Sequence, residues 1–165
     1  MNTSDKLSKK ELKSIALVAH DNCKNDLVEW VKWNSKLLLQ HKLICTGTTG
    51  LRIEQALKEH GSLKKPSIKK LKSGPLGGDL QLGALIAEGK IDILIFFWDP
   101  MQPQPHDVDV KALLRIAVVY NIPFANNRAT ADYIIASALL HTDYQPRVNN
   151  YNAYLNREAS KTAKK

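Results

Sequence analysis

The chain has 165 residues, of which 44% are apolar, and a formal net charge of +8 at pH 7. This length fits one domain with short tails, and a domain of this size can bury a core without disulfides. Cys23 and Cys45 lie in different segments, with no C-x-x-C spacing and no secretory signal before them, so we expect a reduced, cytoplasmic compartment. The longest apolar run, Ile91–Trp98, is far shorter than the ~20 residues that cross a bilayer, which excludes a membrane-spanning protein.

The positive charge is concentrated in three segments. Residues 1–14 have a net charge of +2, residues 58–72 of +5 and residues 157–165 of +3, which leaves −2 for the remainder of the chain. Lysines dominate these segments, and the arginines and stacking aromatics of nucleic-acid surfaces are nearly absent from them. The alternative interpretation, a nucleic-acid-binding protein, depends on these three segments alone. The composition therefore favours solvated, solubilising segments and no nucleic-acid partner.

Short apolar runs alternate with helical periodicity in the first half of the chain. In chain order, the pattern predicts a strand at 14–19, a helix from Asp21 or Asn22 to about 41, a strand at 43–45, a turn at 46–50, a helix from about 51 and a strand at 68–71. The apolar side of the first helix is expected to include both Trp30 and Trp33.

The second half continues the alternation, and its clearest strand is the run IDILIFFW. In chain order, the pattern predicts a loop at 73–79, a helix that stops at Gly89, a strand at 91–98, a Pro-rich loop at 99–107, a helix at 108–120, a strand at 122–125, a helix at 130–139, a loop at 141–150 and a helical tail at 151–157.

An alternation of this kind is typical of a parallel sheet with helices on both faces. We predict an α/β protein of three layers, α/β/α, with a mostly parallel sheet of about five strands. The domain is expected to span 14–157, between a polar N-terminal extension at 1–13 and a basic tail at 158–165. Ligands of such folds bind at the carboxyl ends of the strands. The loops that follow strands are therefore the candidates for a site.

Two of these loops have the composition of anion-binding loops. Thr46–Gly50 is rich in hydroxyls and glycine and leads into a helix, where backbone N–H groups attract phosphate. It lacks the Gly-Lys-Ser/Thr of a nucleotide-binding P-loop. Ser73–Asp79 combines Ser and Gly with two glycines that bring the Asp79 carboxylate close to a ligand. Each loop alone could equally be a helix cap.

The other two loops contribute histidines and charges. His20 and Lys24 are four residues apart after the first strand, so one helical turn can place both over one site. The fourth loop holds Asp99, His106 and Asp109, which suggests a proton relay. No metal-ligand spacing such as H-x-x-x-H is present, so no metal is expected. Alone, His20 could be a core histidine and the fourth loop a polar connection.

All four loops fall on one edge of the predicted sheet, which changes how each is interpreted. Together they supply two anion-binding loops, a lysine, two histidines and several carboxylates, without a cofactor motif. This inventory fits cofactor-free acid–base chemistry on a small phosphorylated sugar, in which a carboxylate removes a proton beside a carbonyl and a histidine stabilises the enediolate.

Several long segments resemble one enzyme family over about residues 15–137, in order and nearly without gaps. These segments are ALVAHDNCK, TGTTG, SGPLGGDLQLGALIAEGKIDILIFFWDP, PHDVDVKALLR and NIPFANNRATAD. They are similar to methylglyoxal synthases. The resemblance implies a Rossmann-like fold, a homohexamer, and conversion of dihydroxyacetone phosphate to methylglyoxal and inorganic phosphate without metal or coenzyme. Phosphate would be both product and inhibitor.

The resemblance also implies roles for individual residues. Asp79 would take the C3 proton, His106 would polarise the carbonyl, and Asp109 and Asp99 would support these groups. The residues implied to hold the substrate and its phosphate are His20, Lys24, Thr46, Gly47, Thr48, Thr49, Ser73 and Gly74.

Two stretches depart from the family pattern. The Lys-rich connection 58–72 looks longer and more basic than usual. The family's late arginine, which reaches the phosphate from a neighbouring subunit, has only an approximate counterpart in Arg157, because Glu158 occupies the aligned place.

A non-catalytic alternative has the same fold, which also serves as a regulatory domain in carbamoyl phosphate synthetase. Such a module needs the anion-binding loops but no acid–base pair. The presence of both Asp79 and His106 in their motifs favours the enzyme.

Overall fold

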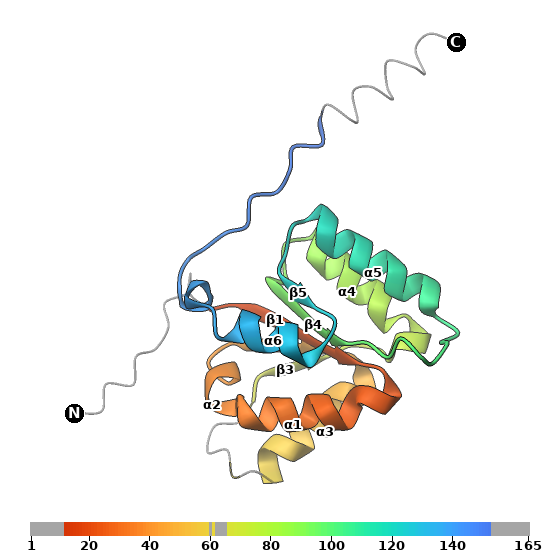
Figure 1. Cartoon of the computed structure of the whole chain (residues 1–165), viewed down its shortest axis with the longest axis vertical. Coiled ribbons are helices and arrows are strands. Elements are labelled where there is room, and N and C mark those ends of the chain that lie inside the picture. Colours follow the sequence, from red (N-terminus) through yellow and green to blue (C-terminus); the bar gives the residue numbers. More distant parts are fainter. Residues whose placement is uncertain (1–11, 60, 62–65, 153–165) are drawn as a thin grey trace, which may run out of the picture.

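The protein folds around one five-stranded sheet in which all strands are parallel (Figure 1). The structure is a computed structural model, and it describes residues 12–59, 61 and 66–152. The strand order is β3-β2-β1-β4-β5. The strands are β1 (Ser14–Ala19), β2 (Lys42–Cys45), β3 (Ile68–Lys70), β4 (Ile93–Phe97) and β5 (Phe124–Ala125).

Helices cover both faces of this sheet, so the predicted three-layer α/β/α fold is confirmed (Figure 1). The α-helices are α1 (Lys24–Trp33), α2 (Ser35–Leu38), α3 (Gly47–Glu59), α4 (Gly78–Ala87), α5 (Asp107–Val119) and α6 (Arg128–Ile135). Three short 3-10 turns are η1 (Asp21–Cys23), η2 (Gly74–Leu76) and η3 (Ala138–His141). Helices α4 and α5 pack on one face, and α1, α3 and α6 pack on the other.

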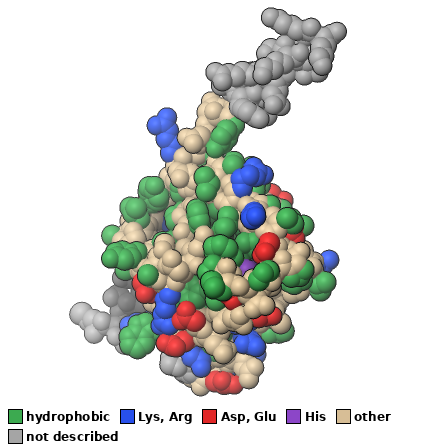
Figure 2. All heavy atoms as spheres, turned by 45° about the vertical axis from the view of Figure 1, so that its right-hand side comes forward, with side chains coloured by type: hydrophobic (Ala, Val, Ile, Leu, Met, Phe, Trp, Pro, Cys, Tyr) green, Lys and Arg blue, Asp and Glu red, His purple; other side chains and the backbone are tan. Residues whose placement is uncertain are grey.

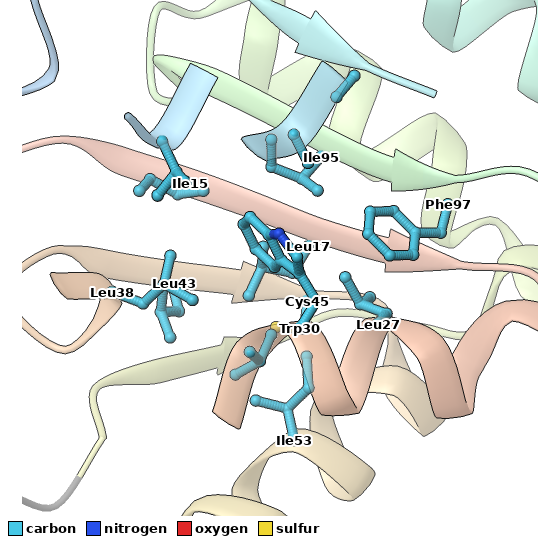
Figure 3. Packing of buried hydrophobic residues seen from close by; sticks show 14 of the residues in the cluster. Ile15, Leu17, Leu27, Trp30, Leu38, Leu43, Cys45, Ile53, Ile95 and Phe97 are labelled. Atoms are coloured by element: carbon cyan, nitrogen blue, oxygen red, sulfur yellow. The ribbon is translucent and has the colours of Figure 1, made fainter. Parts of the chain in front are cut away.

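The core is divided by the sheet into two apolar layers because successive side chains of each strand point to opposite faces. Ile15 and Leu17 of β1 contribute to the layer under α1, whereas Ala16 and Val18 contribute to the layer under α4 and α5. Figure 3 shows Trp30 of α1 against β1 in the first layer. Strands buried on both faces are typical of parallel sheets.

Strand order reverses at β1, which pairs with β2 on one side and with β4 on the other. In folds of this kind, such a switch point opens a crevice at the carboxyl ends of the strands. The loops that follow β1 and β4 therefore lead away from each other there, and a ligand can bind in the crevice between them.

The predicted turn at 46–50 is wrong, because α3 already begins at Gly47. Thr46 accepts the first helical hydrogen bond from the Gly50 N–H, at 2.8 Å. A Cβ on Gly47 would lie 3.2 Å from both the Leu71 carbonyl oxygen and the Ser73 nitrogen. The first turn of α3 is therefore helical although it consists of Gly and Thr, because the loop at 71–73 packs tightly against it.

The predicted helix to about 41 is interrupted at Asn34, between α1 and α2. The Asn34 side chain donates to the Trp30 carbonyl at 2.9 Å, a local bond that competes with regular helix. The expected apolar side is also wrong at one position. Trp33 is 87% exposed, whereas Trp30 is 1% exposed.

The predicted helix at 130–139 is two elements, because α6 ends at Ile135 and η3 follows. Ser137 caps η3 by accepting a hydrogen bond from the Leu139 N–H at 3.2 Å. Most of the predicted tail at 151–157 and of the extension at 1–13 lies outside the described residues, as does part of the connection 58–72. Within the described part of the chain, no helix has the length and apolarity needed to span a bilayer.

Candidate active site

A cavity of about 290 Å³ lies at the carboxyl edge of the sheet, beside the switch point. Its wall is built by the end of β1, the starts of α1, α3 and α4, the turn η2, and the loop before α5. The lining residues are Val18, Ala19, His20, Asp21, Lys24, Thr46, Thr48, Thr49, Ser73, Gly74, Pro75, Asp79, Gln104 and His106.

The most unusual group in this wall is the carboxylate of Asp79. Asp79 is in the first turn of α4 and is only 2% exposed. Neither carboxylate oxygen has a hydrogen-bond partner within the described part of the chain, although Oδ2 lies 3.5 Å from His106 Nε2. Burial raises the pKa of Asp79 above its ordinary value, against the opposing effect of His106. A buried carboxylate without bonds is a candidate base for a bound ligand.

Two glycines permit this arrangement by letting loops approach closely. A Cβ on Gly74 would lie 2.7 Å from His106 Nε2 and 3.2 Å from Asp79 Oδ2. A Cβ on Gly78 would lie 2.2 Å from the Lys72 carbonyl oxygen, which no side chain tolerates. Gly74 and Gly78 therefore allow the loop before α4 to lie directly against the start of this helix and its Asp79 carboxylate.

Thr46 and the first turn of α3 supply hydroxyl groups to the cavity wall. Thr46 and Thr49 are buried, and their hydroxyls lie 3.4 Å apart. Thr48 accepts a hydrogen bond from Lys24 Nζ at 3.1 Å, and Lys24 also forms an ion pair with Asp21. Hydroxyls and an ammonium beside a helix start together suit a phosphate.

His20 also lines the cavity. It is 5% exposed, and its ring centre lies 5.9 Å from that of His106. Burial and, to a lesser degree, the neighbouring His106 lower the pKa of His20. The Asp99 N–H donates to Nδ1 at 3.3 Å, while Nε2 has no partner within the described residues.

Nine of the twelve residues predicted for the site line this cavity, and Gly47, Asp99 and Asp109 do not. The Gly47 N–H is bonded to the Lys72 carbonyl at 3.1 Å. Asp109, in the first turn of α5, acts at a distance, because its charge contributes to the raised pKa of Asp79. Asp99 bonds to Asn22 and to the Met101 N–H instead of facing the cavity.

The cavity also contains residues that sequence reasoning missed as site residues. Asp21 lies two residues after the end of β1, so its place after a strand is an available signal, although an aspartate there is also a common helix cap. Pro75 lies in η2 and Gln104 in the loop before α5, and although both loops are candidates, neither residue type by itself indicates a ligand contact. The described residues contain no group of three or more His, Cys, Asp or Glu side chains that could hold a metal ion.

Fold and cavity together define an α/β protein with a buried carboxylate–histidine pair and a hydroxyl-rich helix start in one cavity wall. The family described as "MGS-like domain" matches residues 26–126. The methylglyoxal synthase of Maridesulfovibrio salexigens is 53% identical over an alignment of 155 residues, which covers 90% of this chain and 98% of that protein. The methylglyoxal synthase of Coxiella burnetii is 55% identical over 146 residues, 88% and 97% of the two chains.

A solved structure shows the same relationship. The methylglyoxal synthase of Elizabethkingia anophelis superposes with a TM-score of 0.81 at 52% identity, covering 89% of this chain and 92% of that one. The chain belongs to the methylglyoxal synthase family. These relatives support an enzyme of that kind.

Proposed function

We propose that the protein converts dihydroxyacetone phosphate to methylglyoxal and inorganic phosphate. The observation that carries this proposal is the Asp79 carboxylate, which is buried, without bonds among the described residues, and 3.5 Å from His106 Nε2. The hydroxyl-rich start of α3 and Lys24, which line the same small cavity, support a phosphorylated substrate.

Binding would place the phosphate at the α3 end of the cavity. Lys24 and the hydroxyls of Thr48 and Ser73 offer positive charge and donors there. The carbon chain of the substrate would then extend toward Asp79, with its carbonyl oxygen near His106. Inorganic phosphate uses the same donors, so it is expected to compete with substrate.

Chemistry would begin with proton transfer from C3 to the Asp79 carboxylate. The electron pair of the broken C–H bond forms the enediolate, whose oxygen receives a hydrogen bond from His106. The C–O bond to phosphate then breaks and its electron pair leaves with phosphate, while the C3 hydroxyl becomes the aldehyde carbonyl and its proton passes to the enediolate oxygen. The enol aldehyde that remains becomes methylglyoxal when its hydroxyl proton moves to the methylene carbon, and the proton held by Asp79 leaves with the phosphate as hydrogenphosphate. Expulsion requires the C–O bond to phosphate to stand perpendicular to the enediolate plane.

The experiment is an assay of the purified chain with dihydroxyacetone phosphate and a chelator, following methylglyoxal and phosphate together. We expect equal release of both. Asp79→Asn should lower kcat by about 10³-fold while leaving phosphate binding intact, because only the base is lost. The matched control, Asp143→Asn, removes an exposed carboxylate and should keep the wild-type rate.

Other outcomes would decide between the remaining functions. Binding without product release would contradict the enzyme and favour a regulatory phosphometabolite-binding module. Formation of glyceraldehyde 3-phosphate would show that the phosphate is held in the enediolate plane and that the proton returns to carbon. A near-wild-type rate of Asp79→Asn would remove Asp79 from the mechanism.

The homohexamer and the cytoplasmic location stay predictions from the family resemblance and from the sequence. Large apolar side chains on the surface support an assembly of several copies. Trp33, Met101 and Tyr133 are each more than 80% exposed. Figure 2 shows hydrophobic side chains spread over one face, between acidic and basic ones. Large apolar side chains that are exposed in one copy can be covered in an assembly, and light scattering of the full chain would measure the number of copies.

A further inference from the structure

One contact joins the two loops that diverge at the switch point. Asn22 lies in η1, after β1, and Asp99 follows β4. The Asn22 amide donates to Asp99 Oδ2 at 2.8 Å, and the other carboxylate oxygen accepts the Met101 N–H at 2.9 Å. The carboxylate is therefore held from both sides, although it lies outside the cavity wall.

The backbone of Asp99 in turn contacts the site. Its N–H donates to His20 Nδ1 at 3.3 Å, and the opposite ring nitrogen, Nε2, is buried without a partner within the described residues. A neutral imidazole carries one N–H, so an accepting Nδ1 leaves the proton on Nε2. His20 lines the cavity, and with this tautomer it can donate to an oxygen of a ligand.

We propose that Asn22 is a positioning residue: by holding the Asp99 carboxylate, it keeps the Asp99 N–H on His20 Nδ1 and presents Nε2–H of His20 to the phosphorylated substrate. This inference rests on the proposed function. It also assigns Asp99 an indirect role, through the His20 ring, in place of contact with substrate.

The geometry explains why an exposed asparagine matters at this place. A loop that follows a strand has few backbone bonds to fix it, and the side-chain bond from η1 ties the start of the 99–106 loop to β1. Without this bond, the Asp99 N–H moves relative to the ring, and both imidazole tautomers become populated. The titratable groups that face the ring are His106, Asp107 and Asp99.

The test compares Asn22→Ala with Asn25→Ala, since Asn25 is likewise exposed and its side chain accepts a bond from Arg52 at 3.1 Å, away from the cavity. The ring nitrogens of His20 are observed by ¹⁵N NMR in the substrate-free protein, and kcat/KM is measured with dihydroxyacetone phosphate. Denaturation midpoints establish that both variants are folded.

In Asn22→Ala we expect the Nδ1 resonance to move toward that of a tautomer mixture, and kcat/KM to fall about 3- to 10-fold, the loss of one hydrogen bond. Asn25→Ala should match the wild type in both measurements. Unchanged His20 resonances in Asn22→Ala would overturn the proposal even if the rate fell. Because the NMR measurement needs no turnover, it stands whether or not the chain produces methylglyoxal.

Discussion

Gly74 lines the cavity close to both groups proposed for acid–base chemistry. A methyl group there would lie 2.7 Å from His106 Nε2 and 3.2 Å from Asp79 Oδ2. Gly74→Ala must therefore displace the His106 ring, and displacements of about 1 Å can cost 10²-fold in rate. We expect kcat to fall by about 10²-fold with a small change in unfolding free energy, measured by steady-state kinetics and urea denaturation.

The matched control for this substitution is Gly83→Ala, in the middle of α4. A Cβ at Gly83 would meet no atom within 4 Å. Alanine there should stabilise the protein by about 0.5–1 kcal/mol and leave kcat unchanged, because glycine is a poor helix former. If Gly74→Ala kept its activity, the close approach of η2 to the two catalytic groups would not matter for turnover.

Asp109 gives a prediction about the pH dependence of activity. Burial raises the pKa of Asp79, and the nearby Asp109 charge adds to this effect. Since the proposed base works only when ionised, kcat/KM should fall with decreasing pH at a higher pH than an ordinary carboxyl would give. Asp109→Asn removes a like charge, lowers the pKa of Asp79 and should move this acidic limb to lower pH in a pH–rate profile. A shift to higher pH would contradict this electrostatic coupling.

Most site residues could be predicted from the sequence because a parallel sheet collects the loops that follow its strands at one edge. This rule alone brings His20, Thr46, Ser73 and His106 together. It cannot find Gln104, whose place depends on how a Pro-rich loop folds back. Nor can it separate Asp99, which faces Asn22, from the residues that face the cavity, because that depends on side-chain direction.

At the scale of elements, strands were easier to predict than helix ends. Strands such as Ser14–Ala19 are continuous apolar runs, and burial on both faces produces that pattern directly. The start of α3 at Gly47 depends instead on tertiary contact with the loop at 71–73, which overrides the weak helix propensity of Gly and Thr. Periodicity also could not show that α1 ends before Asn34.

The two tryptophans of α1 test which element contacts stabilise the fold. Trp30 is buried, and its indole N–H donates to Asp132 of α6 at 2.7 Å, while Trp33 is 87% exposed. Trp30→Phe should lower the unfolding free energy by about 2 kcal/mol, because it leaves a void and removes a bond to a charged group. Urea denaturation measures this loss.

Trp33→Phe is the matched control, and its unfolding free energy should stay within about 0.5 kcal/mol of the wild type. Equal effects of the two substitutions would mean that α1 is not held to α6 and the sheet through Trp30.

For the whole molecule, the carboxyl ends and the amino ends of the strands carry different buried polar groups. The carboxyl edge holds the cavity, and the amino edge holds His41, directly before β2. His41 is 4% exposed, accepts the Lys13 N–H at Nδ1 over 3.3 Å, and stacks on the His141 ring at 6.3 Å. Burial, helped by the charges of His141 and Lys13, lowers the pKa of His41 from 6.5 to about 4.

This lowered pKa makes stability depend on pH without involving the site. In the unfolded chain His41 is protonated below pH 6.5, whereas in the folded protein it stays neutral down to about pH 4. Between these two pH values the unfolded state binds more protons, so acid lowers the free energy of unfolding. The unfolding free energy lost through His41 should reach about 2 kcal/mol at pH 5 relative to pH 7.5.

In His41→Gln this contribution is absent, so urea denaturation should give a smaller difference in unfolding free energy between the two pH values. Because residue 41 lies at the edge opposite the cavity, kcat of this variant at pH 7.5 should equal that of the wild type. The same pH dependence in both proteins would assign the acid sensitivity to other groups.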